Sequence, residues 1–373
     1  MLGLRNTLVS NYCHRRQYSL SLDGANDWLD IGDNWDPHQN DFSISLWFKA
    51  DSDSGTADIL FSKFVNNNNK IEIGINGSNK LFAQAVASTN NAINNTAGTE
   101  LDALGLNWIH VVLTMNRDGN GKLYVNGSTS TYGISMSAQN DTQNLNNTGS
   151  IYIGARSDNN LDFPGKIDEV AIWNVALDEN AVIAVYNSRK PFDLNYDRGN
   201  YTNSSNLHGY WRMGNGLFDD RQNGVVHDAH NPGFGNENID LTTGSSTQPS
   251  EWSSATTNGV SKLSGGTSVT YYDTGFNTVT GKTYKISCTI SNYESDTNTD
   301  LGFSSTGGIG STVRIAGNGT VTHIFQATSV VDVSLFGRST NTGTFSNVSV
   351  KQLNGYPGIT NADATFSTDT PSD

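Results

Sequence analysis

Cysteine is nearly absent from this chain of 373 residues, which contains only Cys13 and Cys288. A small fold held together by disulfides needs several cysteine pairs, so this class of architecture is excluded. A bridge between these two would have to join the N-terminal arm to a second domain. We therefore expect two free thiols.

Basic residues and long apolar runs are also scarce. The chain has 22 Lys and Arg against 36 Asp and Glu, and its net charge of −14 repels nucleic acid and anionic membrane surfaces. No run approaches the length of a transmembrane helix, and residues 1–17 lack the apolar core and cleavage site of a secretory signal. We expect neither nucleic-acid binding nor membrane insertion, and export by lysis or within a particle if the protein works outside a cell.

What the chain does contain is strand and turn chemistry. Charged residues make up 16% and aromatics 10%, while Gly, Ser, Thr and Asn are abundant, a mixture that favours an all-β protein. Alternating apolar and polar residues predict strands at 18–24, 27–32, 42–50, 57–64, 70–76, 80–86, 108–116, 122–127 and 150–156. The link RDGNG at 117–121 has the Asp-Gly and Asn-Gly pairs of a tight hairpin.

The stretch GKIDEVAIW, residues 165–173, reads as the closing strand of a β-sandwich. Alternation by two would place Asp168 and Glu169 on opposite faces, with Asp168 as the inward carboxylate that needs an ion or a hydrogen-bond donor. After it, Asp178 is placed to cap a short helix that packs on the sandwich. The apolar residues expected on the packed face of this helix are Val182, Ile183 and Val185 or Tyr186.

The pattern divides the chain into five parts. Residues 1–17 form a short basic arm, either disordered or docked on a partner subunit, and residues 18–190 form the first β-sandwich. Periodicity fades over 191–250, which we expect to be a connector packed on the first domain. Strands resume over 251–353 as a second, smaller β-sandwich, and 354–373 reads as a flexible tail.

These residues resemble known families. SLDGANDWLDIG, FSISLWFKA, NWIHVVLTMNRDGNGKLYVNG, IYIGAR and GKIDEVAIWNVALDENAVIAVYN are similar, in this order, to the laminin G-like group of the concanavalin A-like lectin/glucanase superfamily. The likeness runs over 18–190 and implies a β-sandwich jelly roll. The second domain resembles galactose-binding-like jelly rolls of carbohydrate-binding modules, and 207–239 resembles segments of tailed-phage virion proteins, especially marine ones.

The resemblance implies a structural calcium ion at the rim of the sandwich. Carried over to matching positions, Asp23 and Asp168 are the principal ligands, with Asn26 and Asp27 as helpers, since calcium takes six to eight oxygen ligands. The competing interpretation is that Asp23 caps a turn and Asp168 accepts backbone hydrogen bonds.

The fold is shared with glucanases, but the residues do not favour catalysis. The ExDxxE pattern of that branch is missing, and the only close acidic pair on a strand, Asp168 and Glu169, is expected to point to opposite faces. Because a fold does not carry its chemistry with it, we expect a protein that is not an enzyme.

Sugar binding is the activity that the family resemblance leaves open. Lectin sites stack a sugar on an aromatic ring and surround it with polar groups. The candidates are Trp28, Trp35 and Tyr152 in the first domain and Trp252 and Tyr271, next to Tyr272, in the second, although aromatic residues in strands usually pack inward. The amide-rich segments 65–69 and 87–99 are expected to be loops that could contact a ligand or partner.

Three hypotheses follow. The first is a non-enzymatic virion structural protein, such as a capsid decoration, tail or fibre component, that assembles as an oligomer with other virion proteins and attaches to host glycans. The second is a secreted or surface carbohydrate-binding module or adhesin, and the third is a glycoside hydrolase. The missing signal peptide favours the first over the second, and the missing carboxylate motif disfavours the third.

Overall fold

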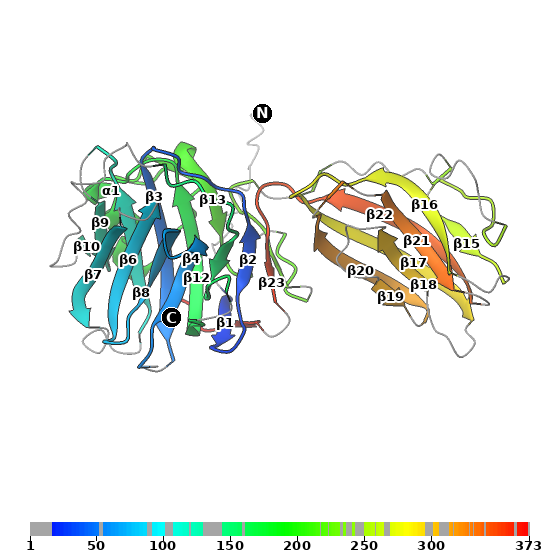
Figure 1. Cartoon of the computed structure of the whole chain (residues 1–373), viewed down its shortest axis with the longest axis horizontal. Coiled ribbons are helices and arrows are strands. Elements are labelled where there is room, and N and C mark those ends of the chain that lie inside the picture. Colours follow the sequence, from blue (N-terminus) through cyan, green and yellow to red (C-terminus); the bar gives the residue numbers. More distant parts are fainter. Residues whose placement is uncertain are drawn as a thin grey trace, which may run out of the picture. The chain divides into compact units, whose positions relative to one another are not determined.

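A computed structural model describes the chain from residue 17 to residue 371, with internal gaps (Figure 1). The gaps are residues 52–54, 88–91, 101–106, 119–120, 130–143, 159–160, 217, 223, 232–233, 236–240, 243–249, 258, 265–268, 295–300, 306–312, 316, 328, 331, 339–340 and 362–363. The arm predicted at 1–17 thus lies outside the described residues, except for Gln17. The chain forms two compact units: unit 1 is Met1–His230 with Gly358–Asp373, and unit 2 is Asn231–Pro357.

Unit 1 contains two antiparallel sheets of eight strands each, which confirms the predicted β-sandwich. Sheet A has the order β10-β9-β8-β3-β12-β1-β24, with β13 also paired to β12. Its strands are β10 (Ser128–Thr129), β9 (Gly121–Val125), β8 (Ile109–Met115), β3 (Phe42–Ala50), β12 (Pro164–Trp173), β1 (Ser19–Asp23), β24 (Thr365–Ser367) and β13 (Leu207–Trp211).

Sheet B has the order β14-β23-β2-β11-β4-β5-β6-β7. Its strands are β14 (Val225–Val226), β23 (Gly358–Thr360), β2 (Leu29–Gly32), β11 (Ile151–Ile153), β4 (Asp58–Asn66), β5 (Asn69–Ile75), β6 (Lys80–Ala87) and β7 (Ala92–Glu100). The prediction of a loop at 87–99 is wrong over 92–99, where β7 pairs with β6. This Asn- and Thr-rich segment has no apolar alternation, so its sequence did not indicate a strand.

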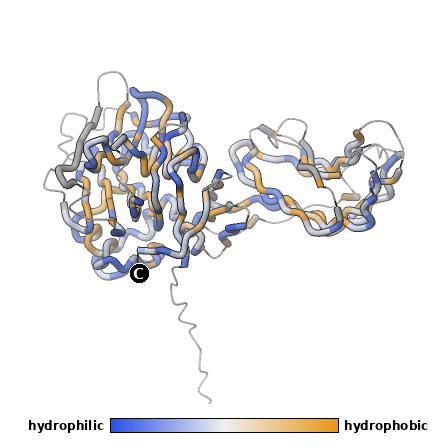
Figure 2. The backbone as a smooth tube through the Cα atoms, turned by 90° about the horizontal axis from the view of Figure 1, so that it is seen from below, coloured by the Kyte–Doolittle hydropathy of each residue, from blue (hydrophilic) through white to orange (hydrophobic). Residues whose placement is uncertain are grey.

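The core of unit 1 follows from strand alternation (Figure 2). One face of β3 carries four fully buried apolar side chains, those of Phe42, Ile44, Leu46 and Phe48. The other face of β3 is also covered, because the Ser43 hydroxyl accepts a hydrogen bond from the backbone N–H of Leu177 and the ring of Trp47 stacks on Tyr186. Sheet A is therefore buried on both sides around β3.

Strand β12 lies in the interior of sheet A, between β3 and β1, rather than at its edge. Its register with β3 shifts between Asp168 and Ala171, and Glu169 has a φ of 50°, so a β-bulge interrupts the alternation. Asp168 lies opposite Trp47, and Glu169 accepts a hydrogen bond from the Tyr210 hydroxyl. The prediction that the two carboxylates separate to opposite faces is wrong, because the bulge leaves both on the covered outer side of the sheet.

One α-helix is present in the described part of the chain, α1 (Glu179–Tyr186), together with the 3₁₀ turns η2 (Asn187–Arg189) and η3 (Ser204–Asn206). The Asp178 carboxylate accepts a hydrogen bond from the Ala181 N–H at 2.8 Å, which confirms the predicted N-cap. Val182 and Val185 are buried as expected, but Ile183 is 48% exposed and faces solvent, which corrects its predicted packing.

The segments after the helix divide between the units. Apolar residues of the predicted connector, including Phe192, Leu194 and Tyr201, pack with Trp173, whereas Leu241 lies in the core of unit 2. The predicted flexible tail is wrong over 358–360 and 365–367, because β23 pairs with β2 and β24 pairs with β1. Short polar strands of this kind are stabilised by their pairing partners rather than by their own periodicity.

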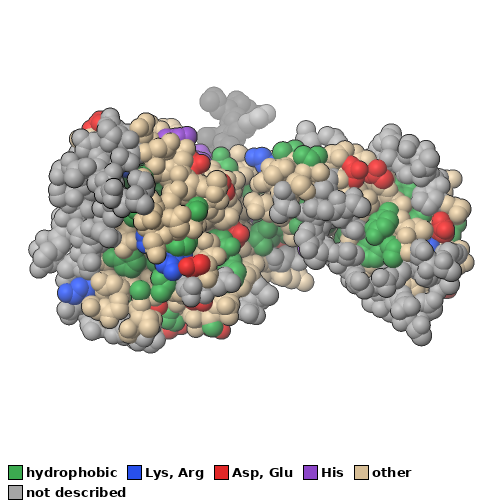
Figure 3. All heavy atoms as spheres, in the orientation of Figure 1, with side chains coloured by type: hydrophobic (Ala, Val, Ile, Leu, Met, Phe, Trp, Pro, Cys, Tyr) green, Lys and Arg blue, Asp and Glu red, His purple; other side chains and the backbone are tan. Residues whose placement is uncertain are grey.

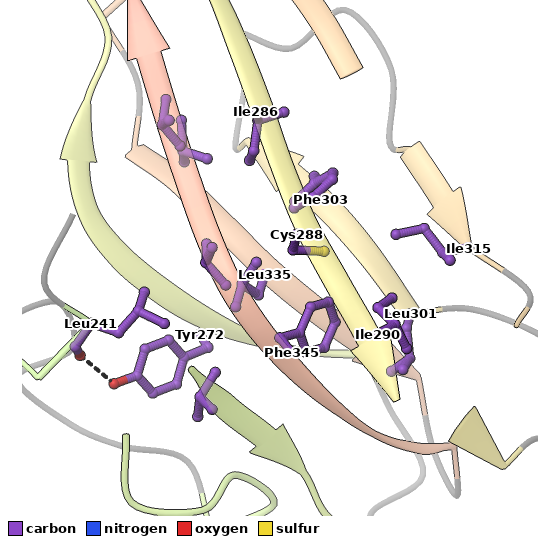
Figure 4. Packing of buried hydrophobic residues seen from close by; sticks show 14 of the residues in the cluster. Leu241, Tyr272, Ile286, Cys288, Ile290, Leu301, Phe303, Ile315, Leu335 and Phe345 are labelled. Atoms are coloured by element: carbon purple, nitrogen blue, oxygen red, sulfur yellow. Dashed lines mark hydrogen bonds between the residues drawn. The ribbon is translucent and has the colours of Figure 1, made fainter. Parts of the chain in front are cut away.

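Unit 2 contains two four-stranded sheets around one apolar core. The first has the order β15 (Val260–Lys262), β22 (Thr342–Gln352), β17 (Thr283–Glu294), β20 (Gly319–Gln326), and the second β16 (Val269–Asn277), β21 (Asp332–Arg338), β18 (Leu301–Ser305), β19 (Val313–Ile315). The Tyr272 hydroxyl donates to the Leu241 carbonyl at 2.6 Å at one end of this core (Figure 4).

Cys288 is a free thiol inside the core of unit 2, and burial raises the pKa of this thiol to about 12. No helix of the described residues is both long and apolar enough to cross a bilayer.

Candidate functional site

The structure does not bring the two predicted principal calcium ligands together. Asp23 pairs with Pro164 in the register of β1 and β12, so Asp168 lies four positions further along β12. At about 3.3 Å per residue, this places Asp168 roughly 13 Å away along the strand. Asp168 is also fully buried beside Trp47, whereas Asp23 is exposed.

Three carboxylates do surround the loop at 23–27, but each already accepts a backbone hydrogen bond. Asp23 accepts from Ala25, Asp27 accepts from Asp23 at 2.8 Å, and Asp162 accepts from Asn26 at 2.9 Å. Over the residues that the structure describes, no three His, Cys, Asp or Glu side chains are arranged to hold a metal ion. The hydrogen bond from Ala25 fits the turn-capping interpretation of Asp23, and calcium at this loop stays a prediction.

Two of the predicted aromatic residues belong to the cores. Trp35 is 3% exposed and its indole N–H donates to Asn174 at 3.2 Å. Trp252 is 4% exposed and donates to the hydroxyl of Thr270 at 3.1 Å. Neither ring can stack on a ligand, and Tyr272 is likewise 3% exposed, so these candidates are corrected to core residues.

Trp28 and Tyr152 form a stacked pair in unit 1. Their ring centroids lie 5.6 Å apart with an interplanar angle of 10°, and both side chains are partly exposed. Leu29 and Ile31 of β2 are buried on the inner face of sheet B, so Trp28 and Asp30 belong to its outer face. Two residues predicted separately for sugar binding are thus joined into one aromatic surface.

Tyr152 continues into a row of polar side chains across sheet B. Strand register places five residues directly beside one another: Asp30, Tyr152, Ser62, Glu72 and Gln84. We call this set the polar row. Directly opposed residues on antiparallel strands share a face, so the polar row crosses β2, β11, β4, β5 and β6 on one side of the sheet.

The ends of the polar row reach solvent, and its centre does not. Asp30, Tyr152 and Gln84 are partly exposed, whereas Ser62 and Glu72 are each 1% exposed. Glu72 Oε1 and Ser62 Oγ have no hydrogen-bond partner among the residues that the structure describes, although Glu72 and Ser62 are paired in the strand register. Buried polar groups are normally paired, so the centre of the polar row has unused hydrogen-bonding capacity.

The electrostatics of the polar row differ along its length. Burial raises the pKa of Asp30, against hydrogen bonds from Gly32 and Ser150 that lower it. Burial also raises the pKa of Tyr152, and the charge of Asp30 adds to this effect. Glu72 pairs with Lys70 at 2.8 Å, and the Arg156 guanidinium lies 4.6 Å from the centre of the Phe64 ring.

A serine–histidine contact elsewhere in unit 1 is sealed from solvent. Ser45 Oγ lies 2.8 Å from His110 Nε2, and the two side chains are 1% and 0% exposed beneath Tyr186. A nucleophile and its base would have to reach a substrate, so this pair is packing rather than an active site.

Sequence reasoning found Trp28 and Tyr152 but missed Asp30, Ser62 and Glu72. Each sits at a polar position of an alternating segment, so the pattern indicated a shared face within each strand. Only the pairing of five strands aligns them across the sheet. In unit 2, Tyr271 is 46% exposed beside Phe336, so it stays a separate candidate.

Comparisons with known proteins agree with this fold. Residues 23–183 match the family model Laminin_G_3, described as the concanavalin A-like lectin/glucanases superfamily. Among curated protein sequences, none matches the chain significantly.

Solved structures with similar folds cover part of the chain. A putative carbohydrate binding protein from Bacteroides ovatus is 18% identical, with a TM-score of 0.40 over 58% of this chain and 56% of that one. A heptameric SAP-like pentraxin from Limulus polyphemus is 15% identical, with a TM-score of 0.37 over 48% and 84%. The receptor binding domain of botulinum neurotoxin D is 19% identical, with a TM-score of 0.35 over 45% and 43%. The chain spans little more than half of the Bacteroides protein. The match to the family model shows a concanavalin A-like lectin/glucanase domain within residues 23–183 of unit 1.

Proposed function

We propose that unit 1 binds a glycan, without cleaving it, on the outer face of sheet B. The observation that carries this proposal is the partly exposed Trp28–Tyr152 stack at the end of the polar row. A sugar ring presents C–H groups that pack on an aromatic surface, while its hydroxyls need hydrogen-bond partners nearby. Asp30 lies directly beside Tyr152 in the register and supplies such an acceptor.

The spacing of carboxylates supports binding over hydrolysis. Asp30 and Glu72 stand three strand positions apart in the polar row. At about 4.8 Å per strand their backbones are roughly 14 Å apart. Glycosidases place two carboxyl groups about 5–9.5 Å apart across the bond they cleave.

Substitution of the aromatic pair tests the proposal. In a glycan-array screen followed by calorimetry, Trp28→Ala and Tyr152→Ala should each weaken binding about tenfold or more, because truncating an aromatic anchor removes a dominant contact. Tyr196→Ala is the matched control, since Tyr196 is 70% exposed and lies outside the polar row. Retained binding in both site variants would contradict the proposal.

Two further arms locate the site. Tyr271→Ala should leave the binding unchanged if unit 1 carries it, and loss of binding there would move the site to unit 2. Addition of a chelator should also leave the affinity unchanged, because the predicted calcium ligands Asp23 and Asp27 are not members of the polar row. Loss of binding with chelator would restore the calcium hypothesis.

We propose as a second role that the protein is a non-enzymatic virion component, alone as an oligomer or with other virion proteins. This rests on the resemblance of 207–239 to virion segments and is compatible with glycan attachment. Electron microscopy of the purified protein should show symmetric oligomers or incorporation into particles. Monomers with strong glycan binding would favour a secreted or surface carbohydrate-binding module instead.

A further inference from the structure

The basic groups that adjoin the polar row are already neutralised. Lys70 Nζ lies 2.8 Å from Oε2 of Glu72, which is a member of the polar row. The Arg156 guanidinium donates two hydrogen bonds of 2.8 Å to the carboxylate of Asp158. A bidentate pair of this kind fixes the guanidinium plane and occupies both of its parallel donors.

Asp30 differs from the other carboxylates at this site. Its side chain accepts from the backbone N–H of Gly32 at 2.8 Å, and over the described residues no basic side chain forms an ion pair with it. Two ion pairs, Lys70–Glu72 and Arg156–Asp158, each sum to zero charge. The carboxylate of Asp30 therefore leaves these five groups with a net charge of −1. That uncompensated charge lies next to the aromatic stack.

The wider surface has the same character. The chain carries a net charge of −14, and on the face seen in Figure 3 few of the coloured atoms belong to Lys or Arg. An approaching anion thus meets repulsion at long range, and among the described residues no free cation adjoins the polar row. A neutral sugar meets acceptors for its hydroxyl groups.

We propose that this site selects uncharged glycans and discriminates against glycans that carry carboxylate or sulfate groups, with Asp30 as the specificity-determining residue. The inference rests on the proposed glycan-binding function and adds the class of ligand. Carboxylates are acceptors only, so they match the hydroxyl and amide donors of a neutral sugar. An anionic substituent about 4–6 Å from Asp30 should weaken binding roughly three- to fivefold, even at the high dielectric constant of a solvated surface.

The experiment compares matched glycan pairs. An array presents neutral oligosaccharides beside the same oligosaccharides bearing sialic acid, uronic acid or sulfate, such as N-acetyllactosamine and its sialylated form. The full-length protein should bind the neutral member of each recognised pair roughly three- to fivefold more strongly at about 50 mM salt. Higher salt should narrow the ratio, because it screens the repulsion.

Two variants test the residues. Asp30→Asn keeps the shape and one acceptor but removes the charge, so the ratio within a pair should fall toward one. Asp158→Asn changes the cation instead of the anion, because it removes the carboxylate that pairs with the Arg156 guanidinium. This variant should raise the affinity for the acidic glycan of each pair. Because Asp158 is an exposed residue, this variant tests the charge balance even if Asp30→Asn folds poorly.

The outcomes separate the two proposals. Equal or stronger binding of the acidic glycans by the natural protein would overturn the selectivity and leave glycan binding intact. A ratio unchanged in both variants would also overturn the assignment to these residues. Absence of binding to every member of the array would overturn the proposed function together with the inference.

Discussion

Burial decides the chemistry of single residues in this protein. His110 is fully buried in contact with the rings of Trp47 and Tyr186, and this burial lowers the pKa of His110 to about 3. His208 Nε2 donates a hydrogen bond to the carbonyl of Asn34 at 3.0 Å, and burial lowers the pKa of His208 to about 4. Both rings are therefore neutral at pH 7, although a histidine in the unfolded chain titrates near pH 6.5.

These histidines predict acid sensitivity at the residue scale. A folded-state pKa below the unfolded value means that the unfolded chain takes up protons first, so stability is complete above about pH 6.5 and falls as the pH drops toward 4. The loss should approach 1.4 kcal/mol per pH unit for each histidine. Urea unfolding at pH 7.5 and pH 5 measures this difference.

The variant His110→Gln isolates one contribution. Between pH 7.5 and 5 it should lose about 2 kcal/mol less than the natural protein, since one titrating group is gone. His38→Gln, at an exposed position, is the matched control. An unchanged pH dependence in His110→Gln would contradict the assignment to this ring.

At the scale of elements, β12 shows how a bulge changes the meaning of a sequence pattern. Glu169 is 2% exposed and receives the hydroxyl of Tyr210, while Arg212 Nε lies 3.5 Å from its other oxygen. Tyr210 lies in β13, the strand that pairs with the second half of β12, and Arg212 comes directly after this strand. The bulge thus aims a carboxylate at the segment that covers the sheet.

Removing the Tyr210 hydroxyl should destabilise unit 1. Tyr210→Phe leaves the buried Glu169 without this donor, and we expect a loss of about 1–3 kcal/mol in the free energy of unfolding. In a double-mutant cycle with Glu169→Gln, the two losses should couple by about 0.5–3 kcal/mol. The control Tyr196→Phe, at a residue 70% exposed, should stay within about 0.5 kcal/mol. Additive losses would show that the two side chains act separately.

Much of the fold was predictable at this scale. The β3 segment, the hairpin between β8 and β9 and the Asp178 cap all depend on neighbours close in sequence, and they are confirmed. Strands β7, β23 and β24 have few alternating apolar residues and depend on partners far along the chain. The bulge at Glu169 was invisible for the same reason, because it is defined by the register against β3.

For the whole molecule, the connection of the two units is the main topological result. Val226 of β14 pairs directly with Gly358 of β23, so the chain leaves unit 1 and returns to it at adjacent positions of one sheet. The returning segment then reaches sheet A, where Asp369 accepts hydrogen bonds from Lys49 at 2.6 Å and from the Trp108 indole at 2.8 Å. Unit 2 is inserted between two strands of unit 1.

This arrangement predicts the outcome of two deletions. Replacing residues 231–357 by a short Gly-Ser loop should preserve the folding of unit 1 and its glycan binding, because the two ends of the insertion are already paired. Ending the chain at residue 357 should lower the melting temperature of unit 1, since it removes β23, β24 and the contacts of Asp369. Calorimetry of both variants is the measurement, and a cooperative, unchanged melt after truncation would contradict it.

The sequence by itself determined the all-β class and its β-sandwich, because alternation and turn chemistry are local properties of the chain. It also named the two aromatic residues that meet on sheet B, but only as separate candidates. Tertiary structure alone decided that Asp23 and Asp168 are apart, that Trp35 and Trp252 are core, and that Asp30, Ser62 and Glu72 align with Tyr152. The physical reason is register. One residue of shift between strands would move every side chain of the polar row to another neighbour, and no single segment carries that information.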